Sequence, residues 1–366
     1  MYSLSEQKEE FNKICPNSDF IPTVLPRVPR VIAIGDIHGN LRLAIRSFQI
    51  AKLIDEERNW VANPLNTIVV QVGDQIDSCR PSVTNACNIR KQPDDVADDM
   101  NVIKFFDDMH KKAKVHGGAV YSLLGNHELM NSQGMMKYVS YENKHSFEYN
   151  DGITDYLGEQ GRIDAFKPGG GVARHLACSR PSILIIGQTM FAHAGVIPIL
   201  TEKLQHLSIP HHDKLTYINQ LVRKWLLNDP DTTNTMFNSS QDLNTIIDGS
   251  TPNTASPFWT RIFGNIHENT NISSGDCSSH VNKTIHTYQI GQLVVGHTPQ
   301  VNKNGINGTC YDKDIQRNRL FRIDGGFATA FDELLNRKRK IRLCQVLEII
   351  NDSKFNIITE TLAEKK

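Results

Sequence analysis

The sequence has no excess of either charge, because its 366 residues include 40 lysines and arginines and 40 aspartates and glutamates. Proteins that bind the phosphate backbone of nucleic acids usually carry a basic excess or a stripe of lysine and arginine. The densest basic run, residues 337–342, is short and is typical of a solvated loop before a strand. We therefore expect no nucleic-acid partner.

Long hydrophobic runs are missing too. No apolar segment approaches the roughly 18 residues needed to span a bilayer, and the first ten residues have no apolar segment of the kind found in secretory signals. These absences predict a soluble, intracellular protein, which we expect in the cytoplasm, without a membrane partner.

Cysteine is sparse and follows no recognisable pattern. The chain has seven cysteines and no Cys-x-x-Cys pair, so a zinc knuckle or a disulfide framework is disfavoured and reduced thiols are expected. One alternative stays open. Cys79 and Cys87 bracket a polar stretch and could pair or respond to redox state.

Short β-rich apolar runs alternate with longer segments of helical periodicity, which predicts an α/β layer fold. The expected strands of the first two-thirds are residues 30–34, 67–72, 119–124, 182–186 and 189–192, and the expected helices are 40–53, 95–115 and 214–227. Further strand-like runs at 293–295, 320–323, 344–350 and 355–358 predict a second, more antiparallel sheet. Polar stretches near 78–94 and 228–282 are typical of insertions.

Polar clusters flanked by glycine follow five of the expected strands. They are Gly35-Asp36-Ile37-His38-Gly39, Gly73-Asp74-Gln75-Ile76-Asp77, Gly125-Asn126-His127-Glu128, His193-Ala194-Gly195 and Gly296-His297-Thr298. Groups at the carboxyl ends of neighbouring strands converge on one crevice, where open α/β sheets place their sites. Carboxylate, imidazole and amide ligands without thiolates suit Mn, Fe or Zn in a catalytic site with open positions.

In order and spacing, these clusters resemble the signature of the calcineurin-like metallophosphoesterases, and within them the phosphoprotein phosphatases. The segments 167–174, 257–261 and 324–327 look most like the Shewanella-like branch of that group. The resemblance implies a four-layer α/β/β/α sandwich with two mixed central sheets. It also implies one domain over residues 29–360, with residues 1–28 as a polar extension and 361–366 as a tail.

The resemblance further implies a site that holds two divalent metal ions, with Mn foremost and Fe or Zn as alternatives. By position, the ligands of the first ion are Asp36, His38 and Asp74, and those of the second are Asp74, Asn126, His193 and His297. A shared carboxylate is needed because two cations about 3.5–4 Å apart repel each other, and together they can activate a bridging water. That water, as hydroxide, is then expected to attack phosphorus in line.

Two further residues of these clusters receive catalytic roles by the same resemblance. His127 is expected to protonate the leaving group, and Asp77 to orient it. Histidine suits proton transfer because its unperturbed pKa of about 6.5 is close to working pH.

The residues that bind phosphate are where the sequence departs from the family. An Asp-Arg-Gly is expected where the chain has Asp77-Ser78-Cys79, so an arginine is missing at position 78. We expect Arg80 to reach back in its place, because arginine binds phosphoryl oxygens in bidentate fashion. The remaining candidates for phosphate contacts are Arg261 as the second arginine, Arg162 and Arg174 as substitutes, and Asn126.

The function that these residues predict is a metal-dependent phosphoester hydrolase, foremost a protein serine/threonine phosphatase. Its substrate would be a phosphorylated protein or a small phosphoester. Two alternatives stay open: a hydrolase of dinucleoside polyphosphates or other nucleotides on the same fold, and a weakly active phosphatase-like binding protein. The sequence leaves phosphotyrosine preference and oligomeric state undecided.

Overall fold

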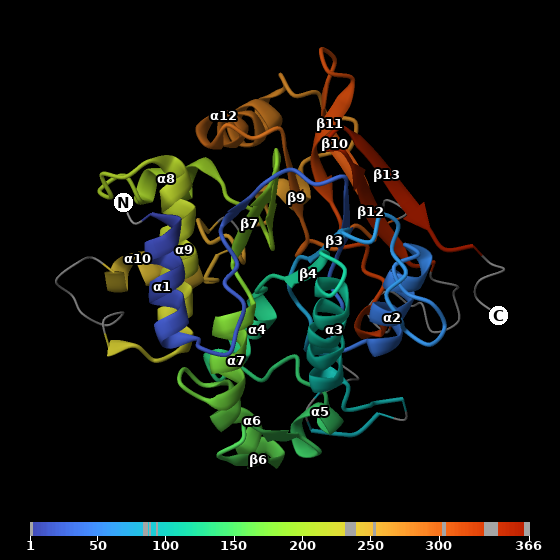
Figure 1. Ribbon diagram of the computed structural model, residues 1–366, viewed down its shortest axis with the longest axis vertical. Helices are drawn as coiled ribbons and strands as arrows, with labels where there is room; N and C mark the ends of the chain where they lie inside the picture. Colours follow the sequence, from blue (N-terminus) through green and yellow to red (C-terminus); the bar gives the residue numbers. More distant parts are fainter. Residues whose placement is uncertain are drawn as a thin grey trace.

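A computed structural model describes residues 3–82, 87, 89–92, 94–230, 239–251, 254–301, 305–332 and 343–361. Two large mixed sheets form its centre (Figure 1). The five-stranded sheet has the order β13 (Lys354–Thr359), β12 (Gln345–Ile350), β2 (Arg30–Ile34), β3 (Ile68–Gln71), β4 (Ala119–Ser122). The six-stranded sheet has the order β1 (Val24–Leu25), β7 (Ile183–Ile186), β8 (Thr189–Ala192), β9 (Gln292–Val295), β11 (Arg317–Arg322), β10 (Asn307–Asp312).

The inner strands β2 and β3 of the five-stranded sheet are buried on both faces, which explains why they are nearly continuous apolar runs in the sequence. Val31 and Ala33 of β2 face the other sheet, in a core layer that also contains Leu184 of β7. Ile32 and Ile34, which alternate with them, face the helices α2 (Leu41–Ile50) and α3 (Asp99–Lys114). The alternation therefore places one core layer between the sheets and another beneath the helices.

A third core layer covers the outer face of the six-stranded sheet. Ile183 and Leu293 contact residues of α7 (Gly171–Ser179), α9 (His211–Leu226) and α12 (Lys283–Tyr288) there. Figure 1 shows α9 on one side of the strands and α2 on the other. The predicted four-layer arrangement with two mixed sheets is therefore confirmed.

The remaining elements are short and flank this sandwich. They are α4 (Asn126–Ser132), α5 (Tyr141–His145), the hairpin β5 (Glu148–Asn150) and β6 (Asp155–Leu157), α6 (Gly158–Phe166), α8 (Pro198–Lys203), α10 (Ser239–Ile247), α11 (Ile262–Asn265), η3 (Cys277–Asn282) and η4 (Thr329–Phe331). Several of them lie in the stretch 228–282 that the sequence predicted as an insertion. Ile246, Phe263 and Cys277 belong to the outer core layer, so much of that stretch is part of the fold.

The strands after residue 290 do not form a separate sheet, as the sequence had predicted. β9 pairs in parallel with β8 and β11, so it extends the sheet that β7 and β8 begin. β12 instead lies antiparallel beside β2, with Leu347 opposite Ala33, and β13 follows it at the edge. The apolar runs show that these segments are strands, but they carry no information about which partner each strand takes.

The N-terminal segment is not a polar appendage, in contrast to what we expected for residues 1–28. Its helix α1 (Leu4–Ile14) begins with a capping box formed by Ser3 and Glu6, and its Phe11 is buried. β1 then pairs in parallel with β7. The segment is thus part of the sandwich, whereas the predicted tail lies outside the described residues except for position 361.

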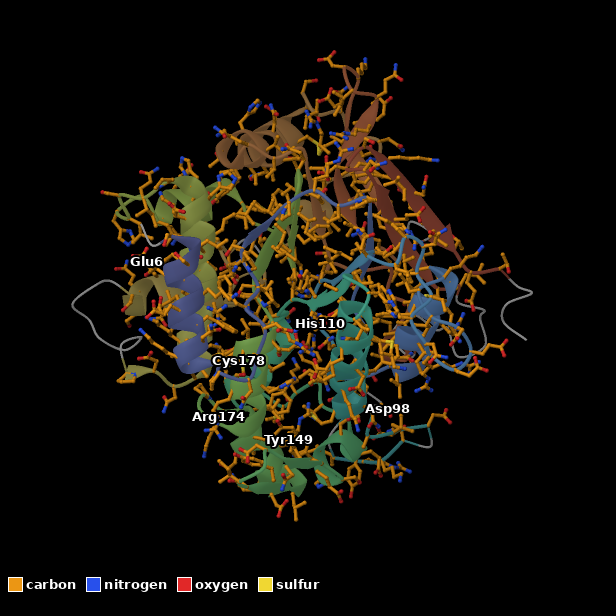
Figure 2. All side chains as sticks on the ribbon, in the orientation of Figure 1. Glu6, Asp98, His110, Tyr149, Arg174 and Cys178 are labelled. Atoms are coloured by element: carbon orange, nitrogen blue, oxygen red, sulfur yellow. A yellow bond between two sulfur atoms is a disulfide. The ribbon has the colours of Figure 1, made fainter. Side chains whose placement is uncertain are left out.

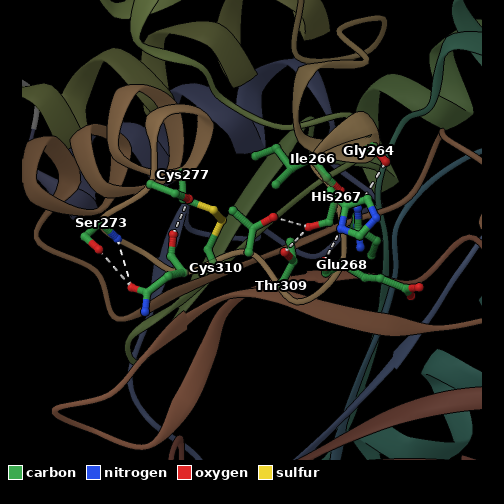
Figure 3. The surroundings of a disulfide bond; sticks show 12 residues. Gly264, Ile266, His267, Glu268, Ser273, Cys277, Thr309 and Cys310 are labelled. Carbon is green, nitrogen blue, oxygen red and sulfur yellow. Dashed lines mark hydrogen bonds between the residues drawn. A yellow bond between two sulfur atoms is a disulfide. The ribbon is translucent and has the colours of Figure 1, made fainter.

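Six of the seven cysteines form disulfides, so the prediction of reduced thiols is wrong for all but Cys344. The pairs are Cys15–Cys178, Cys79–Cys87 and Cys277–Cys310. Figure 2 labels Cys178, and Figure 3 shows how the third pair ties η3 to β10. Partners up to 163 positions apart meet through the fold, which sequence spacing alone cannot reveal. Disulfides persist in oxidising compartments, so these three weigh against the cytoplasm that the sequence predicted.

Among the described residues, we find no helix whose length and apolar character would let it cross a bilayer.

Candidate active site

The site is built from loops that leave the ends of β2, β3, β4, β8 and β9. Four of its residues have left-handed backbone conformations, with φ of 48° at His38, 55° at Asp74, 72° at Asp77 and 66° at His297. Such conformations are unfavourable for residues with side chains and tend to occur where the surroundings impose them. Here the N–H groups of residues 37 and 38 donate to the carbonyl oxygen of Asp74, which joins the first two loops.

Two glycines allow the loops to approach closely. A Cβ on Gly125 would lie 2.2 Å from Oδ1 of Asp74, and a Cβ on Gly296 would lie 2.3 Å from Oδ1 of Asp36. Any side chain at either position would therefore displace a carboxylate. Steric crowding thus explains why glycine occupies these two positions beside the clusters.

Asp74 stands at the centre of the polar groups. Its Oδ2 lies 3.3 Å from Nε2 of His193 and 3.8 Å from Nε2 of both His38 and His127. Two buried sets of side chains could each hold a metal ion, and they share this residue: Asp74 with His38 and His127, and Asp74 with His193 and His297.

Asn126 and Asp36 complete the predicted ligand set. Oδ1 of Asn126 lies 2.9 Å from Nε2 of His193 and 2.9 Å from Nδ1 of His297. Oδ2 of Asp36 lies 3.9 Å from Nε2 of His38. The structure therefore brings together all six residues that the sequence predicted as ligands, and the donors fit two divalent cations around one shared carboxylate.

The charges of these buried groups are poorly balanced among themselves. Burial, reinforced by the nearby Asp324 and Asp74, raises the pKa of Asp36 well above its usual value. Burial alone would also raise the pKa of Asp74, but the histidines around it, His193 foremost, hold it well below its usual value. Bound divalent cations would satisfy these carboxylates.

Two imidazoles of the site, those of His38 and His297, are suited to bind cations. Burial, together with the positive charge of Arg80, lowers the pKa of His38 well below its usual value. Burial and the neighbouring His193 act in the same direction on the pKa of His297. Both rings are thereby favoured in the neutral form, which is the form that binds a metal ion.

His127 and Asp77 form a buried pair beside Asp74. Nδ1 of His127 lies 2.7 Å from Oδ2 of Asp77, whose Oδ1 accepts a hydrogen bond from Nδ2 of Asn131. The N–H of Asp77 donates to Oδ1 of Asp99. The carboxylate is fixed from two sides, so it can orient the imidazole and leave Nε2 facing the site.

Glu128 holds two of the loops together, a role that the sequence analysis missed although it quoted the residue. Its carboxylate accepts hydrogen bonds from the N–H groups of Asp74, Gln75 and Gly125, at 3.0, 2.8 and 2.7 Å. One side chain therefore fixes the turn after β3 against the turn that begins α4.

Asp324 is a second residue that received no role from the sequence. Burial raises its pKa to about 6, and its Oδ2 is buried without a hydrogen-bond partner among the described residues. Its charge acts on Asp36, as the pKa of that residue shows. The signal in the sequence that could have pointed to Asp324 was the Gly-Gly pair that follows it. That pair permits a tight turn, in which the N–H of Gly326 donates to Oδ1 of Asp324.

Arg80 lies beside the first set of ligands and is only partly buried, and we call this partly exposed part of the site its open side. Its Nη2 is 2.8 Å from Nε2 of His38, and its guanidinium carbon is 4.6 Å from the ring centroid of Phe331 and 5.3 Å from that of Tyr138. Arg261, which is also only partly buried, lies beside the second set, where its Nη1 is 3.4 Å from the carbonyl oxygen of His297.

Arg162 and Arg174 are not at the open side. Arg162 is fully buried behind Asp77, where it donates to Asp99 and Asn131. Arg174, labelled in Figure 2, is about half exposed and pairs with Asp151. Of the four arginines proposed from the sequence, the structure therefore places two at the site.

A two-sheet sandwich with clustered Asp, His and Asn ligands at its strand ends defines a metal-dependent phosphoesterase. The chain matches the calcineurin-like phosphoesterase family over residues 29–301 and belongs to it. Members of this family use divalent metal ions for hydrolysis.

The chain is also similar in sequence to two other proteins and in fold to one solved structure. It is 50% identical over 258 residues to the uncharacterized protein R398 of Acanthamoeba polyphaga mimivirus, covering 70% of this chain and 98% of that protein. It is 25% identical to Shewanella-like protein phosphatase 2 of Arabidopsis thaliana, covering 93% of this chain and 80% of that protein. Its fold is similar to the cold-active protein-tyrosine phosphatase of a psychrophilic Shewanella species, with a TM-score of 0.60 and 16% identity over 94% of this chain and 84% of that one.

Proposed function

We propose that this protein is a dinuclear metal-dependent phosphomonoesterase that removes phosphate from phosphoserine and phosphothreonine in proteins. One observation carries the proposal. Asp74 is shared by two sets of buried side chains that could each hold a metal ion, and His127 of the first set is paired through Nδ1 with Asp77. The phosphorylated protein is the proposed partner.

Bound cations, Mn foremost with Fe or Zn as alternatives, would supply Lewis acidity and an activated water for attack on phosphorus. The protein contributes the rest through its own side chains. His127 donates a proton from Nε2 to the departing serine or threonine oxygen. Asp77 keeps that imidazole in place and stabilises its charged form.

The two arginines at the open side favour a terminal phosphate as the substrate group. A phosphomonoester dianion presents three free oxygens, and the guanidinium groups of Arg80, beside His38, and Arg261, beside His297, can bind them together with the amide of Asn126. A phosphate inside a dinucleoside polyphosphate has fewer free oxygens and would use only part of this set. The relative from Arabidopsis, named as a protein phosphatase, supports the same choice.

A substrate panel tests the proposal. The protein, loaded with Mn²⁺, is given p-nitrophenyl phosphate, a phosphoserine peptide, a phosphotyrosine peptide and a dinucleoside tetraphosphate. We expect the highest kcat/KM among the three natural substrate types for the phosphoserine peptide. Turnover of the tetraphosphate alone would mean a nucleotide hydrolase, and turnover of none would mean a binding protein. The Asp74→Asn variant, purified in parallel, controls for contaminating phosphatases.

A further inference from the structure

We propose that the Cys79–Cys87 disulfide positions Arg80 for phosphate binding, so that the cross-link, and not only the arginine, takes the place of the residue missing at position 78. This inference rests on the proposed function, because it assigns a role within the same site. It concerns positioning residues that do not themselves touch the substrate.

The first step is that position 78 is closed to the substrate. The side chain of Ser78 lies against α5, where its Oγ accepts a hydrogen bond from Nδ2 of Asn143 at 3.0 Å. A Cβ added to Gly39 would lie 2.9 Å from Cβ of Ser78. A longer side chain at position 78 in this conformation would collide with Asn143 or Gly39. The phosphate contact therefore has to come from another residue of the loop.

The second step is that the turn around Arg80 presents its guanidinium to the site. Nη1 donates to the carbonyl oxygens of Asp77 at 3.1 Å and Cys79 at 2.8 Å. The rings of Phe331 and Tyr138 flank the group at cation–π distances. The two backbone bonds depend on the path of the chain through residues 77–80, so a shift of that path would move the guanidinium.

The third step is that the disulfide fixes this path on its far side. On the near side, Asp77 is held by Asp99, His127 and Asn131. Beyond it, the sequence up to residue 94 is polar and contains few apolar residues. Cys79 and Cys87 are both buried, 7% and 3% exposed, with Cα atoms 5.7 Å apart. Cys79 also donates its N–H to the carbonyl oxygen of Tyr138, so the cross-link and the aromatic flank of Arg80 are joined.

The other disulfides have different positions and provide matched controls. Cys15–Cys178 joins the segment after α1 to α7 in the outer helical layer. Removing it should affect stability but not the geometry of residues 77–80.

The experiment compares the Cys79→Ser/Cys87→Ser protein with wild type and with Cys15→Ser/Cys178→Ser. The readouts are kcat and KM for p-nitrophenyl phosphate, the inhibition constant of inorganic phosphate and the metal content. We expect KM and the phosphate inhibition constant to rise about tenfold in Cys79→Ser/Cys87→Ser, as for the loss of one charged hydrogen bond. Metal content should stay at the wild-type level, and Cys15→Ser/Cys178→Ser should keep wild-type constants.

A double-mutant cycle with Arg80→Met separates positioning from general damage. If the disulfide acts through Arg80, removing both cysteines in the Arg80→Met background should change the phosphate inhibition constant less than twofold. A further rise of about tenfold in that background would overturn the proposal, and so would wild-type constants in Cys79→Ser/Cys87→Ser when Arg80→Met alone raises them.

Two further measurements keep the result interpretable. If Cys79→Ser/Cys87→Ser does not fold, the wild-type protein is treated with tris(2-carboxyethyl)phosphine, which is oxidised to its phosphine oxide with oxygen from water while each disulfide becomes two thiols. Mass spectrometry after alkylation identifies which pair is open, and the tenfold rise in KM and in the phosphate inhibition constant should follow opening of Cys79–Cys87.

If wild type hydrolyses no phosphoester, the proposed function fails. Calorimetry with inorganic phosphate then still tests whether phosphate affinity depends on the Cys79–Cys87 cross-link.

Discussion

The inner wall and the open side of the site are held in place by different means. The inner wall consists of Asp36, Asp74 and the histidines at strand ends, and carboxylates such as Glu128 join its loops. The open side consists of Arg80 and Arg261, which lie on loops and make their polar contacts mainly with backbone carbonyl oxygens. The groups that bind metal are thus fixed by the sheets, whereas the groups that meet the substrate depend on loops.

The largest effect is expected at the centre of the inner wall. Asp74→Asn removes the carboxylate shared by both sets of ligands, so metal affinity should fall by more than the roughly 100-fold typical of outer partners of a metal site. Turnover should become undetectable. Mass spectrometry of bound metal after dialysis, alongside the phosphatase assay, measures this. The control is Asp164→Asn on α6, whose partner is the surface residue Lys167. Full metal content in Asp74→Asn would contradict the role of Asp74.

His127→Ala should be the next most severe change, and it should act on turnover alone. The loss of a proton donor lowers kcat by about 10²–10⁴-fold for a phosphoserine peptide. The loss should be smaller for p-nitrophenyl phosphate, whose leaving group needs no proton. Metal content should match wild type, because Asp36, His38 and Asp74 remain to hold the ion on that side, and His116→Ala, a change at an exposed histidine, is the control. Equal losses with both substrates would argue against proton donation.

Arg162→Met should weaken the fold and have only an indirect effect on phosphate binding. The change leaves Asp99 buried beside Asp77 without its cationic partner, and breaking such a pair destabilises a protein by about 3–5 kcal/mol. Urea unfolding measures this loss. If stability were unchanged while KM rose, Arg162 would belong to the open side after all.

The smallest effect is expected at Arg261, the other arginine of the open side. Arg261→Met should raise KM about tenfold, the change for the loss of one charged hydrogen bond to phosphate, and leave the free energy of unfolding nearly unchanged. Arg174→Met is the matched control, because Arg174 is about half exposed and pairs with Asp151. Steady-state kinetics measures KM for both variants. Equal shifts in both would remove the distinction between the two arginines.

The residues of the inner wall could be predicted because each is specified by the residues next to it in the sequence. A buried strand followed by glycine and a ligand pair, as in Asp36 with His38 or Asn126 with His127, specifies both the turn and the edge of the sheet where it lies. The same reasoning put Arg80 forward, since it lies only two residues beyond the expected position.

Long-range pairings could not be predicted in this way. The partners of Cys15 and Cys277 are set by how distant segments pack, and no local pattern in the sequence encodes that. The same holds for β12, whose apolar run fits either sheet equally well. The buried setting of Arg162 was also hidden, because its partners Asp99 and Asn131 come from two other helices.

The place of β12 has a consequence for how the protein is made. β2 carries the first metal-binding loop at its end, and one of its two neighbours in the sheet is β12, which comes almost last in the chain. A ribosome that has released β2, β3 and β4 has therefore produced a sheet with an open edge, and unpaired strand edges invite wrong pairing with other chains. Translation that stops before β12 should yield a fragment that aggregates. The strand β2, made early, thus depends on β12, made late, to cover its open edge.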